Sequence, residues 1–334
     1  MKRQKVKAIG LLSGGLDSIL AVKVVQQQGI EVVGLSFVTP FFGSKLAEKA
    51  ANDLSISLII KDITNEHFKV VKNPLHGFGK TMNPCIDCHA LMFKIAGQIM
   101  RKRNFDFIFS GEVLDERPMS QNRRSLDIVA KISGFKNQII RPLSAKLLEK
   151  SVPEKKGVID REKLLNICGR GRKRQIELAR KFKVKEYPNP AGGCLLTDKG
   201  FSQRLKDLLN SKQKFSDKDL HLLKLGRHYR FSDAAKLIVG RDKGENDLIE
   251  AVFDQTKDYL LLVENIPGPM CLLRGDKLSK HVQSAAEICT AYSDTQENIQ
   301  YRVIVRNKNK ERVLKITCNK AKKGEKRINL MINK

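Results

Sequence analysis

The stretch Ser13-Gly14-Gly15-Leu16-Asp17-Ser18 decides the fold of this chain, because of what stands on either side of it. It follows the apolar run Ala8-Ile9-Gly10-Leu11-Leu12, which predicts a buried parallel strand, and it opens the apolar-periodic stretch 19–25, which predicts a helix. Two glycines between a strand and a helix let a ligand approach the backbone closely. The amides at the helix start carry a partial positive charge, which suits a phosphate. The sequence therefore predicts an α/β fold with a phosphate site after its first strand.

The side chains of this loop add to its chemistry. Ser13 and Ser18 supply hydroxyl donors, and Asp17 can hold a Mg²⁺ ion that bridges phosphates. The stretch lacks the Lys-Ser/Thr ending of the P-loops that cleave a γ-phosphate. It resembles instead the pyrophosphate-binding loop of the PP-loop ATPases, which cleave ATP between the α and β phosphates to make adenylates. The resemblance implies ATP and Mg²⁺, with ATP bound by Ser13, Gly14, Gly15, Asp17 and Ser18; a ligand-free turn of small residues is the competing interpretation.

Strands and helices alternate over residues 7–110. We expect strands at 8–12, 30–37, 56–61 and 105–109, and helices at 18–28, 43–54 and 88–103. This alternation predicts right-handed βαβ units in a doubly wound parallel sheet, with ligands at the carboxyl ends of the strands. The resemblance to the PP-loop ATPases implies a sheet of the adenine nucleotide alpha hydrolase-like kind.

The length of 334 residues suits two domains. We expect a PP-loop domain over residues 1–205, which includes a basic helical segment at 160–190, and a smaller basic α+β domain over 212–334. A polar break near 210–214 separates them. The second domain is expected to contain strands at 235–239, 259–263 and 301–305. The last of these forms a hairpin with 313–316 through the polar stretch 306–310.

The charge of the chain predicts a polyanionic partner. Lys and Arg number 63 against 36 Asp and Glu, a formal net charge of +27. Nucleic acid is the first expectation for this partner. An anionic membrane surface ranks second, because no basic helix carries bulky aromatics on an apolar face as a membrane-binding helix would. Residues 301–334 alone hold twelve Lys and Arg against Glu311 and Glu325, as a surface that follows phosphates would. The basic run 170–185 is either a solvated helix face or a second RNA-facing surface.

No apolar stretch approaches the roughly 20 residues of a membrane span, and no signal-peptide core follows Met1. We therefore expect a cytoplasmic protein. Its seven cysteines are an odd number without secretory context, which favours metal or catalytic roles over disulfides. Cys85 and Cys88 follow Pro84 at a predicted helix start, where backbone amides lower a thiol pKa and favour the thiolate. Cys271, Cys289 and Cys318 stand in apolar contexts and are expected to be buried and inert.

Cys194 ends the stretch Pro188-Asn189-Pro190-Ala191-Gly192-Gly193-Cys194, which can present a thiol to a cleft. With SGGLDS and the stretch Asn83-Pro84-Cys85-Ile86-Asp87-Cys88, it makes residues 5–205 resemble the tRNA 2-thiouridylases, PP-loop enzymes that install sulfur in tRNA uridine. The resemblance implies that Cys88 is the catalytic cysteine and Cys194 the persulfide carrier. Cys85 stands where the family has an aspartate.

Two further positions follow from the same resemblance. The ATP-contacting residue after the second strand falls on Phe37. A Thr-Gly-His element of the family is matched by Ser110-Gly111-Glu112, which places Gly111 beside the adenylate and leaves the histidine unmatched.

Three cysteines, Cys85, Cys88 and Cys194, are one ligand short of a closed zinc or [4Fe–4S] site. A cluster on three cysteines leaves one iron open to hold hydrosulfide, and related sulfur-transferring PP-loop enzymes use such a cluster. We therefore expect a [4Fe–4S] centre. A zinc site completed by Cys168 or His89, and a metal-free cycle of persulfide and disulfide on Cys88 and Cys194, are the alternatives.

The last third of the chain resembles the NFACT-type RNA-binding domain. The similarity lies in Leu225-Gly226-Arg227-His228-Tyr229-Arg230, in residues 236–241 and in Glu245-Asn246. His228 and Tyr229 suit an RNA platform, or else they are simply packed.

These features predict ATP-dependent thiolation of tRNA uridine. The base carbonyl oxygen is adenylated, and sulfur from the three-cysteine centre then displaces AMP. The partners are tRNA and a sulfur donor, either sulfide or a persulfide carrier. The alternatives are a PP-loop ligase or sulfurtransferase that acts on a small molecule, and an RNA-binding adaptor with a degenerate nucleotide site.

Overall fold

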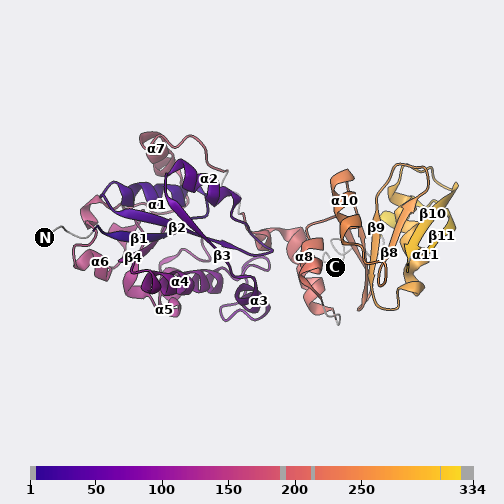
Figure 1. The fold of residues 1–334 in the computed structure, drawn as a ribbon, viewed down its shortest axis with the longest axis horizontal. Helices are drawn as coiled ribbons and strands as arrows, with labels where there is room; N and C mark the ends of the chain where they lie inside the picture. The colour runs from indigo at the N-terminus through magenta and orange to yellow at the C-terminus, as the bar shows by residue number, and fades with distance from the viewer. Residues whose placement is uncertain (1–4, 189–192, 212–214, 309, 325–334) are drawn as a thin grey trace. The chain divides into compact units, whose positions relative to one another are not determined.

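The computed structural model describes residues 5–188, 193–211, 215–308 and 310–324. The chain divides after Leu195 into two compact units, residues 1–195 and 196–334. Each unit is described by itself (Figure 1). No helix in the described ranges is long and apolar enough to cross a membrane.

The first unit is built on a parallel sheet of five strands, in the order β3-β2-β1-β4-β5. The strands are β1 (Lys7–Leu11), β2 (Glu31–Val38), β3 (Ser57–Asp62), β4 (Phe107–Ser110) and β5 (Ile139–Ile140). The chain runs outward from β1 to β3 and then returns to the other side of β1 with β4. The strand order therefore reverses at the carboxyl ends of β1 and β4, where a doubly wound sheet binds its ligands. The predicted fold class is confirmed.

Helices cover both faces of this sheet (Figure 1). One face packs against α1 (Leu16–Gln26), α2 (Lys45–Asp53) and α7 (Lys173–Lys181). The other face packs against α4 (Cys85–Lys102) and α5 (Arg123–Ser133), with α3 (Thr64–Lys72) beside α4. The short helix α6 (Val152–Lys155) lies between α5 and α7 in the chain.

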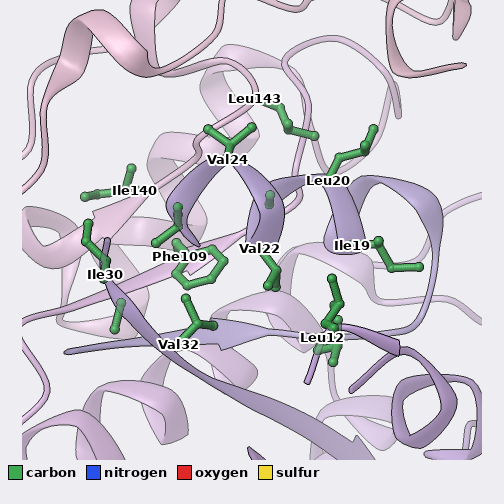
Figure 2. Packing of buried hydrophobic residues seen from close by; sticks show 14 of the residues in the cluster. Leu12, Ile19, Leu20, Val22, Val24, Ile30, Val32, Phe109, Ile140 and Leu143 are labelled. Atoms are coloured by element: carbon green, nitrogen blue, oxygen red, sulfur yellow. The ribbon is translucent and has the colours of Figure 1, made fainter. Parts of the chain in front are cut away.

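The core around α1 explains why the loop before it is held firmly. Figure 2 shows Leu20 and Val24 of α1 among Leu143 and Ile140, with Phe109 of β4 beside them. These side chains are all at most 3% exposed, so α1 is apolar on nearly every side and must be enclosed. The start of α1 is thus fixed against β1 and β4.

The second unit contains an antiparallel sheet of six strands, in the order β11-β10-β8-β9-β7-β6. The strands are β6 (Arg227–Ser232), β7 (Ala235–Val239), β8 (Tyr259–Val263), β9 (Cys271–Gly275), β10 (Gln300–Asn307) and β11 (Lys310–Thr317). The expected hairpin is present, with strands longer than predicted. The predicted smaller α+β domain is confirmed, although β6 and β9 were not among the expected strands.

Helices also cover this second sheet. α11 (Val282–Tyr292) packs on one face, while α9 (Asp217–Leu222) and α10 (Lys243–Val252) belong to the opposite side, and α8 (Lys199–Asn210) precedes them. Cys271, Cys289 and Cys318 are fully buried, as expected. His228 and Tyr229 are at most 1% exposed, so they are packed and do not form an RNA platform.

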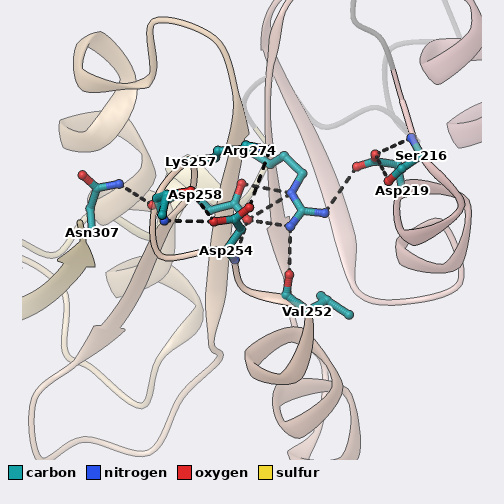
Figure 3. Close-up of polar contacts among 9 residues, drawn as sticks. Ser216, Asp219, Val252, Asp254, Lys257, Asp258, Arg274 and Asn307 are labelled. Atoms are coloured by element: carbon teal, nitrogen blue, oxygen red, sulfur yellow. Dashed lines mark hydrogen bonds and ion pairs between the residues drawn. The ribbon is translucent and has the colours of Figure 1, made fainter. Parts of the chain in front are cut away.

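Buried charges organise one side of the second sheet. Arg274 of β9 donates to the Asp258 carboxylate and to the Val252 carbonyl oxygen, and it also pairs with Asp219 of α9 at 3.3 Å (Figure 3). Nearby, Lys236 is 1% exposed, and its Nζ has no hydrogen-bond partner among the described residues. Burial lowers the pKa of Lys236 to about 8, although Asp219 favours its charged form.

Candidate nucleotide and sulfur-transfer site

The loop between β1 and α1 is a compact turn whose hydroxyls bond within it. Ser18 Oγ donates to the Gly15 carbonyl oxygen at 2.8 Å, and the Gly15 amide donates to Ser13 Oγ at 3.3 Å. The first amides of α1 have no partner within the helix, as at every helix start. The loop therefore presents backbone donors beside the strand ends, as an anion site requires, while the Ser18 hydroxyl is bonded to the Gly15 carbonyl oxygen.

Two glycines of the site lie where no side chain fits. Gly14 has φ of +78°, and a Cβ there would lie 2.3 Å from the Leu46 carbonyl carbon. A Cβ on Gly111 would lie 2.5 Å from backbone atoms of Asp17 and Ser18. Gly111 follows β4, so the chain after β4 runs directly against the first turn of α1. This contact places Gly111 at the predicted nucleotide loop.

Asp17 has charged neighbours that the motif does not include. Its Oδ2 lies 3.9 Å from Arg172 Nη2, and Arg172 Nε lies 4.0 Å from Glu116 Oε1. Burial raises the pKa of Asp17, and the charges of Arg172 and Arg117 oppose that shift. Burial and the charge of Asp17 raise the pKa of Glu116. Two carboxylates and two guanidinium groups thus surround the start of α1.

Phe37 ends up in a different environment from the loop residues. It is 6% exposed and belongs to the apolar cluster between the sheet and α4. Its role in contacting ATP stays a prediction, and any such contact involves its backbone or the small exposed part of its ring.

Cys85 and Cys88 occupy the first turn of α4, as predicted. The side-chain amide of Asn83 donates through Nδ2 to Cys85 Sγ at 3.2 Å, and His67 Nε2 lies 3.1 Å from the buried Cys88 Sγ. Burial raises the pKa of Cys88, and the nearby Cys194 and Cys85 raise it further. The expected lowering by helix amides is therefore wrong for Cys88, because desolvation and two neighbouring thiols outweigh it.

Cys194 approaches this pair from the end of the first unit. The Leu195 amide donates to the Phe41 carbonyl oxygen at 3.0 Å, which fixes the chain just after the cysteine. The electrostatic effect of Cys194 on Cys88 shows that the two thiols are near each other. The predicted flexible approach at 189–192 lies outside the described residues.

His67 is a neighbour of Cys88 that the sequence did not single out. It is fully buried on α3 between the rings of Phe41 and Phe42. Burial lowers the pKa of His67 to about 4, so the ring is neutral at physiological pH. A neutral imidazole therefore lies against Cys88 Sγ and orients that thiol.

A buried charged chain connects the nucleotide loop with the cysteine helix. Glu112 accepts from Arg141 Nε at 2.8 Å and pairs with His89 Nδ1 at 2.8 Å. Although burial opposes it, the Arg141 charge and the His89 contact lower the pKa of Glu112 to about 2. The histidine that the family motif places at position 112 is absent, and His89 of α4 brings an imidazole beside that position instead.

Cys85, Cys88 and Cys194 are the candidate ligands for a metal centre. Three thiols suit a soft metal by their chemistry. Among the residues that the structure describes, however, no three His, Cys, Asp or Glu side chains are grouped so that they could hold a metal ion. As placed, Cys85, Cys88 and Cys194 do not form a metal site.

The two alternative zinc ligands have other partners. His89 is held by Glu112. Cys168 is exposed, with its Sγ 3.5 Å from Asp115 Oδ2, and its neighbour Gly169 donates to the Leu114 carbonyl oxygen.

The basic segment forms α7, which packs on α1. Gln175 and Ala179 are buried against the first unit, while Lys173, Arg180 and Lys181 are exposed. Arg172 stands at the start of this helix, so the segment has both a solvated face and a residue that reaches Asp17.

Comparison with known families agrees with this division. Residues 4–152 match the family described as thiamine biosynthesis protein (ThiI), and residues 226–328 match the NFACT protein RNA binding domain. The first unit is therefore a PP-loop domain that resembles the tRNA 2-thiouridylases. The second unit contains an NFACT-type domain, so both predicted resemblances are confirmed.

Individual relatives carry tRNA-modifying names. A tRNA-specific 2-thiouridylase MnmA 3 of Bacteroides fragilis is 31% identical over 124 residues, which cover 35% of this chain and 34% of that protein. A probable tRNA sulfurtransferase of Bacillus subtilis is 29% identical over 158 residues, covering 43% and 37%. A tRNA-specific 2-thiouridylase MnmA 2 of Fusobacterium nucleatum is 24% identical over 266 residues, covering 75% and 74%. The chain thus spans about a third of the length of the first of these relatives.

Proposed function

We propose that this protein is a cytoplasmic, ATP-dependent tRNA sulfurtransferase that thiolates a uridine. The observation that carries the proposal is the short connection between two chemistries. Gly111 touches the first turn of α1, and the next residue, Glu112, holds His89, which follows Cys88. The contacts of Gly111 with α1 and of Glu112 with His89 therefore connect the candidate nucleotide loop to the helix that carries the thiols, within one unit.

The first step is adenylation of the base. ATP would be bound at Ser13–Ser18 with its phosphates at the amides of α1, and Asp17 would hold a Mg²⁺ ion that offsets the charge of the leaving pyrophosphate. The uridine carbonyl oxygen attacks the α-phosphorus, the bond to the β-phosphate oxygen breaks, and pyrophosphate leaves. The base then carries AMP on its oxygen, which turns a poor leaving group into a good one.

The second step is sulfur transfer at Cys85, Cys88 and Cys194. A sulfide-level sulfur from the donor attacks the activated carbon, the carbon–oxygen bond breaks, and AMP leaves with the former carbonyl oxygen. The sulfur loses its proton to solvent, so the step consumes one sulfide and needs no further oxidant. His67 holds the Cys88 thiol in place for this chemistry.

An iron–sulfur cluster on the three cysteines remains our proposal for the sulfur source, and it requires the thiols to move closer than their described positions. A bound [4Fe–4S] cluster would supply an open iron for hydrosulfide. Protein purified without oxygen should then be brown, with about four irons and four sulfides per chain. Colourless protein with one zinc per chain would overturn the cluster, and colourless metal-free protein active with a persulfide donor would favour the thiol cycle.

The RNA would be bound by the second unit. The strands β10 and β11 carry five Lys and Arg against one Glu, and Val303, Val305 and Ile316 are buried on the α11 side. On the opposite side of the hairpin, Arg302 of β10 lies across from Lys315 of β11, and both side chains are exposed. A basic, solvent-facing strand pair suits an RNA backbone. The last ten residues of the predicted basic tail lie outside the described residues.

The decisive experiment is nucleoside mass spectrometry of tRNA from cells that lack this protein. We expect one thiouridine to disappear, to return with the wild-type chain and to stay absent with Asp17→Ala, which should also abolish tRNA-dependent AMP formation. An unchanged nucleoside profile would overturn the proposal. Pyrophosphate exchange into ATP without tRNA-dependent AMP release would favour a ligase for a small molecule, and no exchange at all would favour an RNA-binding adaptor.

A further inference from the structure

Several buried polar atoms around Asp17 lack partners. Asp17 Oδ1, Arg172 Nε and both amide atoms of Gln175 are inaccessible to solvent and have no hydrogen-bond partner among the described residues. Gln175 is 0% exposed, yet its side chain lies near enough to Asp17 to favour the carboxylate. Buried polar groups are nearly always paired in folded proteins. Their concentration where the starts of α1 and α7 meet indicates a site that a polar ligand completes.

The backbone explains how distant segments reach this point. Gly111 lies against the first turn of α1, and the chain then continues to Glu116. Leu114 forms a parallel bridge with Cys168, so the segment that leads to Arg172 runs alongside the segment that leads to Glu116. Both side chains therefore arrive beside Asp17 from the same edge of the sheet.

The distances show that the charged groups do not satisfy one another. Arg172 lies 3.9 Å from Asp17 and 4.0 Å from Glu116, which exceeds hydrogen-bond length in both cases. Asp17, Glu116 and Arg172 are only 23%, 14% and 18% exposed. Arg172 is thus ion-paired with both carboxylates but hydrogen-bonded to neither, so a ligand that binds at shorter distances can replace these contacts.

We propose that Glu116 joins Asp17 in holding the divalent cation, and that Arg172 binds the phosphates of ATP through its planar fork of donors. This inference rests on ATP binding at the SGGLDS loop, as in the proposed function. Carboxylate oxygens are the ligands that Mg²⁺ prefers, usually one or two together with phosphate oxygens. A guanidinium group matches phosphate oxygens in pairs.

Arg172 also stabilises the two carboxylates in the protein without ATP. Asp17 and Glu116 are like charges in a partly desolvated place, and burial together with their mutual repulsion raises the pKa of Glu116. Arg172 offsets that repulsion. Asp17 and Glu116 would hold the cation of a bound metal–nucleotide complex, which would leave Arg172 for the phosphates.

The metal part of the inference is tested with Mn²⁺, which takes the same oxygen ligands as Mg²⁺. Free Mn²⁺ is measured by electron paramagnetic resonance with the full chain and ATP, without RNA or a sulfur donor. We expect Glu116→Gln to weaken Mn²⁺ binding at least tenfold, as loss of one of two carboxylates should. Glu162→Gln, at an 83% exposed side chain of the same unit, is the control and should bind as wild type.

The phosphate part is tested by calorimetric titration with ATP and with adenosine. We expect Arg172→Gln to weaken ATP binding about tenfold or more, with adenosine binding unchanged. Arg172→Lys keeps the charge without the fork and should recover only part of the loss. Arg180→Gln, exposed on the same helix, should match the wild type. Thermal unfolding of each variant confirms that it is folded.

Wild-type Mn²⁺ affinity in Glu116→Gln, or wild-type ATP affinity in Arg172→Gln, would overturn the corresponding assignment. Failure of the proposed function gives a different result. Protein that passes both binding tests but releases no AMP with tRNA retains the phosphate site and refutes thiolation. Protein that thiolates tRNA while Glu116→Gln binds Mn²⁺ normally refutes only the inference.

Discussion

Gly111→Ala should damage the nucleotide site without touching any side chain of it. The added Cβ would lie 2.5 Å from the Asp17 carbonyl carbon and oxygen and from the Ser18 amide nitrogen. Ordinary contacts begin near 3.4 Å, so α1 and the end of β4 must separate by about 0.9 Å. All three obstructing atoms are backbone, and α1 is enclosed by its core, so no flexible side chain can absorb the shift.

The expected magnitude follows from that displacement. Overpacking of this kind costs about 1–3 kcal/mol in the free energy of unfolding. A misplacement of about 1 Å at a reacting site costs roughly a hundredfold in rate. We therefore expect a lower urea midpoint for Gly111→Ala, weaker ATP binding, and a loss of tRNA-dependent AMP formation that exceeds what the lost stability explains.

Gly43→Ala is the matched control, because a Cβ there has nothing within 4 Å and its φ lies outside the left-handed region. Both substitutions reduce the entropy of the unfolded chain equally, which stabilises each by up to about 1 kcal/mol. The difference between the two variants thus isolates the contact with α1. Equal urea midpoints and equal ATP affinities in the two variants would refute the close approach of Gly111 to the loop.

Three further predictions concern charge. Lys236 has a pKa of about 8 against a usual 10.5, so the free energy of unfolding of the wild type should rise between pH 8 and 10.5. Lys236→Met should lose that rise and be more stable than the wild type at pH 7. Identical pH profiles of stability in the variant and the wild type would contradict the burial of this amine. The pKa of Glu112 is lowered from 4.5 to about 2, so its contribution of about 3 kcal/mol to the free energy of unfolding should be present above pH 4.5 and be lost toward pH 2. Acid unfolding of Glu112→Gln, compared with that of the wild type, measures this contribution. Replacing both Arg302 and Lys315 by Gln should lower the slope of log affinity for tRNA against log salt by about 0.7–0.9 per lost phosphate contact. The 80% exposed Lys257→Gln is its control, and an unchanged slope in the double variant would place the RNA site elsewhere.

The elements predicted from the sequence are those whose signals are local. The loop at Ser13–Ser18 and the helix start at Cys85 each contain their own glycines, proline or cysteines, and the structure has both where expected. The strands at 235–239 and 259–263 were predicted residue for residue, because each is a short apolar run between turns. Local chemistry decided all of these.

What the sequence did not show depends on contacts between distant segments. β6 (Arg227–Ser232) reads as polar and charged, and it becomes a strand because β7 pairs with it and Tyr229 fills the core. Glu116 lies in an irregular polar run, and nothing in its spacing relates it to Arg172; the bridge between Leu114 and Cys168 does so. His67 was one histidine on an amphipathic helix until folding placed it against Cys88.

The buried pair of Glu112 and Arg141 explains why the two halves of the site keep a fixed separation. Both side chains are at most 8% exposed, and the Glu112 carboxylate stays ionised down to about pH 2 because Arg141 and His89 stabilise it. Breaking such a pair leaves a buried charge uncompensated, which costs about 3–5 kcal/mol. Gly111, packed on α1, and His89, next to Cys88, are therefore joined by a link that resists movement. The proposed reaction adenylates the base oxygen at one point and delivers sulfur to the adjoining carbon from another, and it needs that rigidity because both steps act on the same carbonyl group.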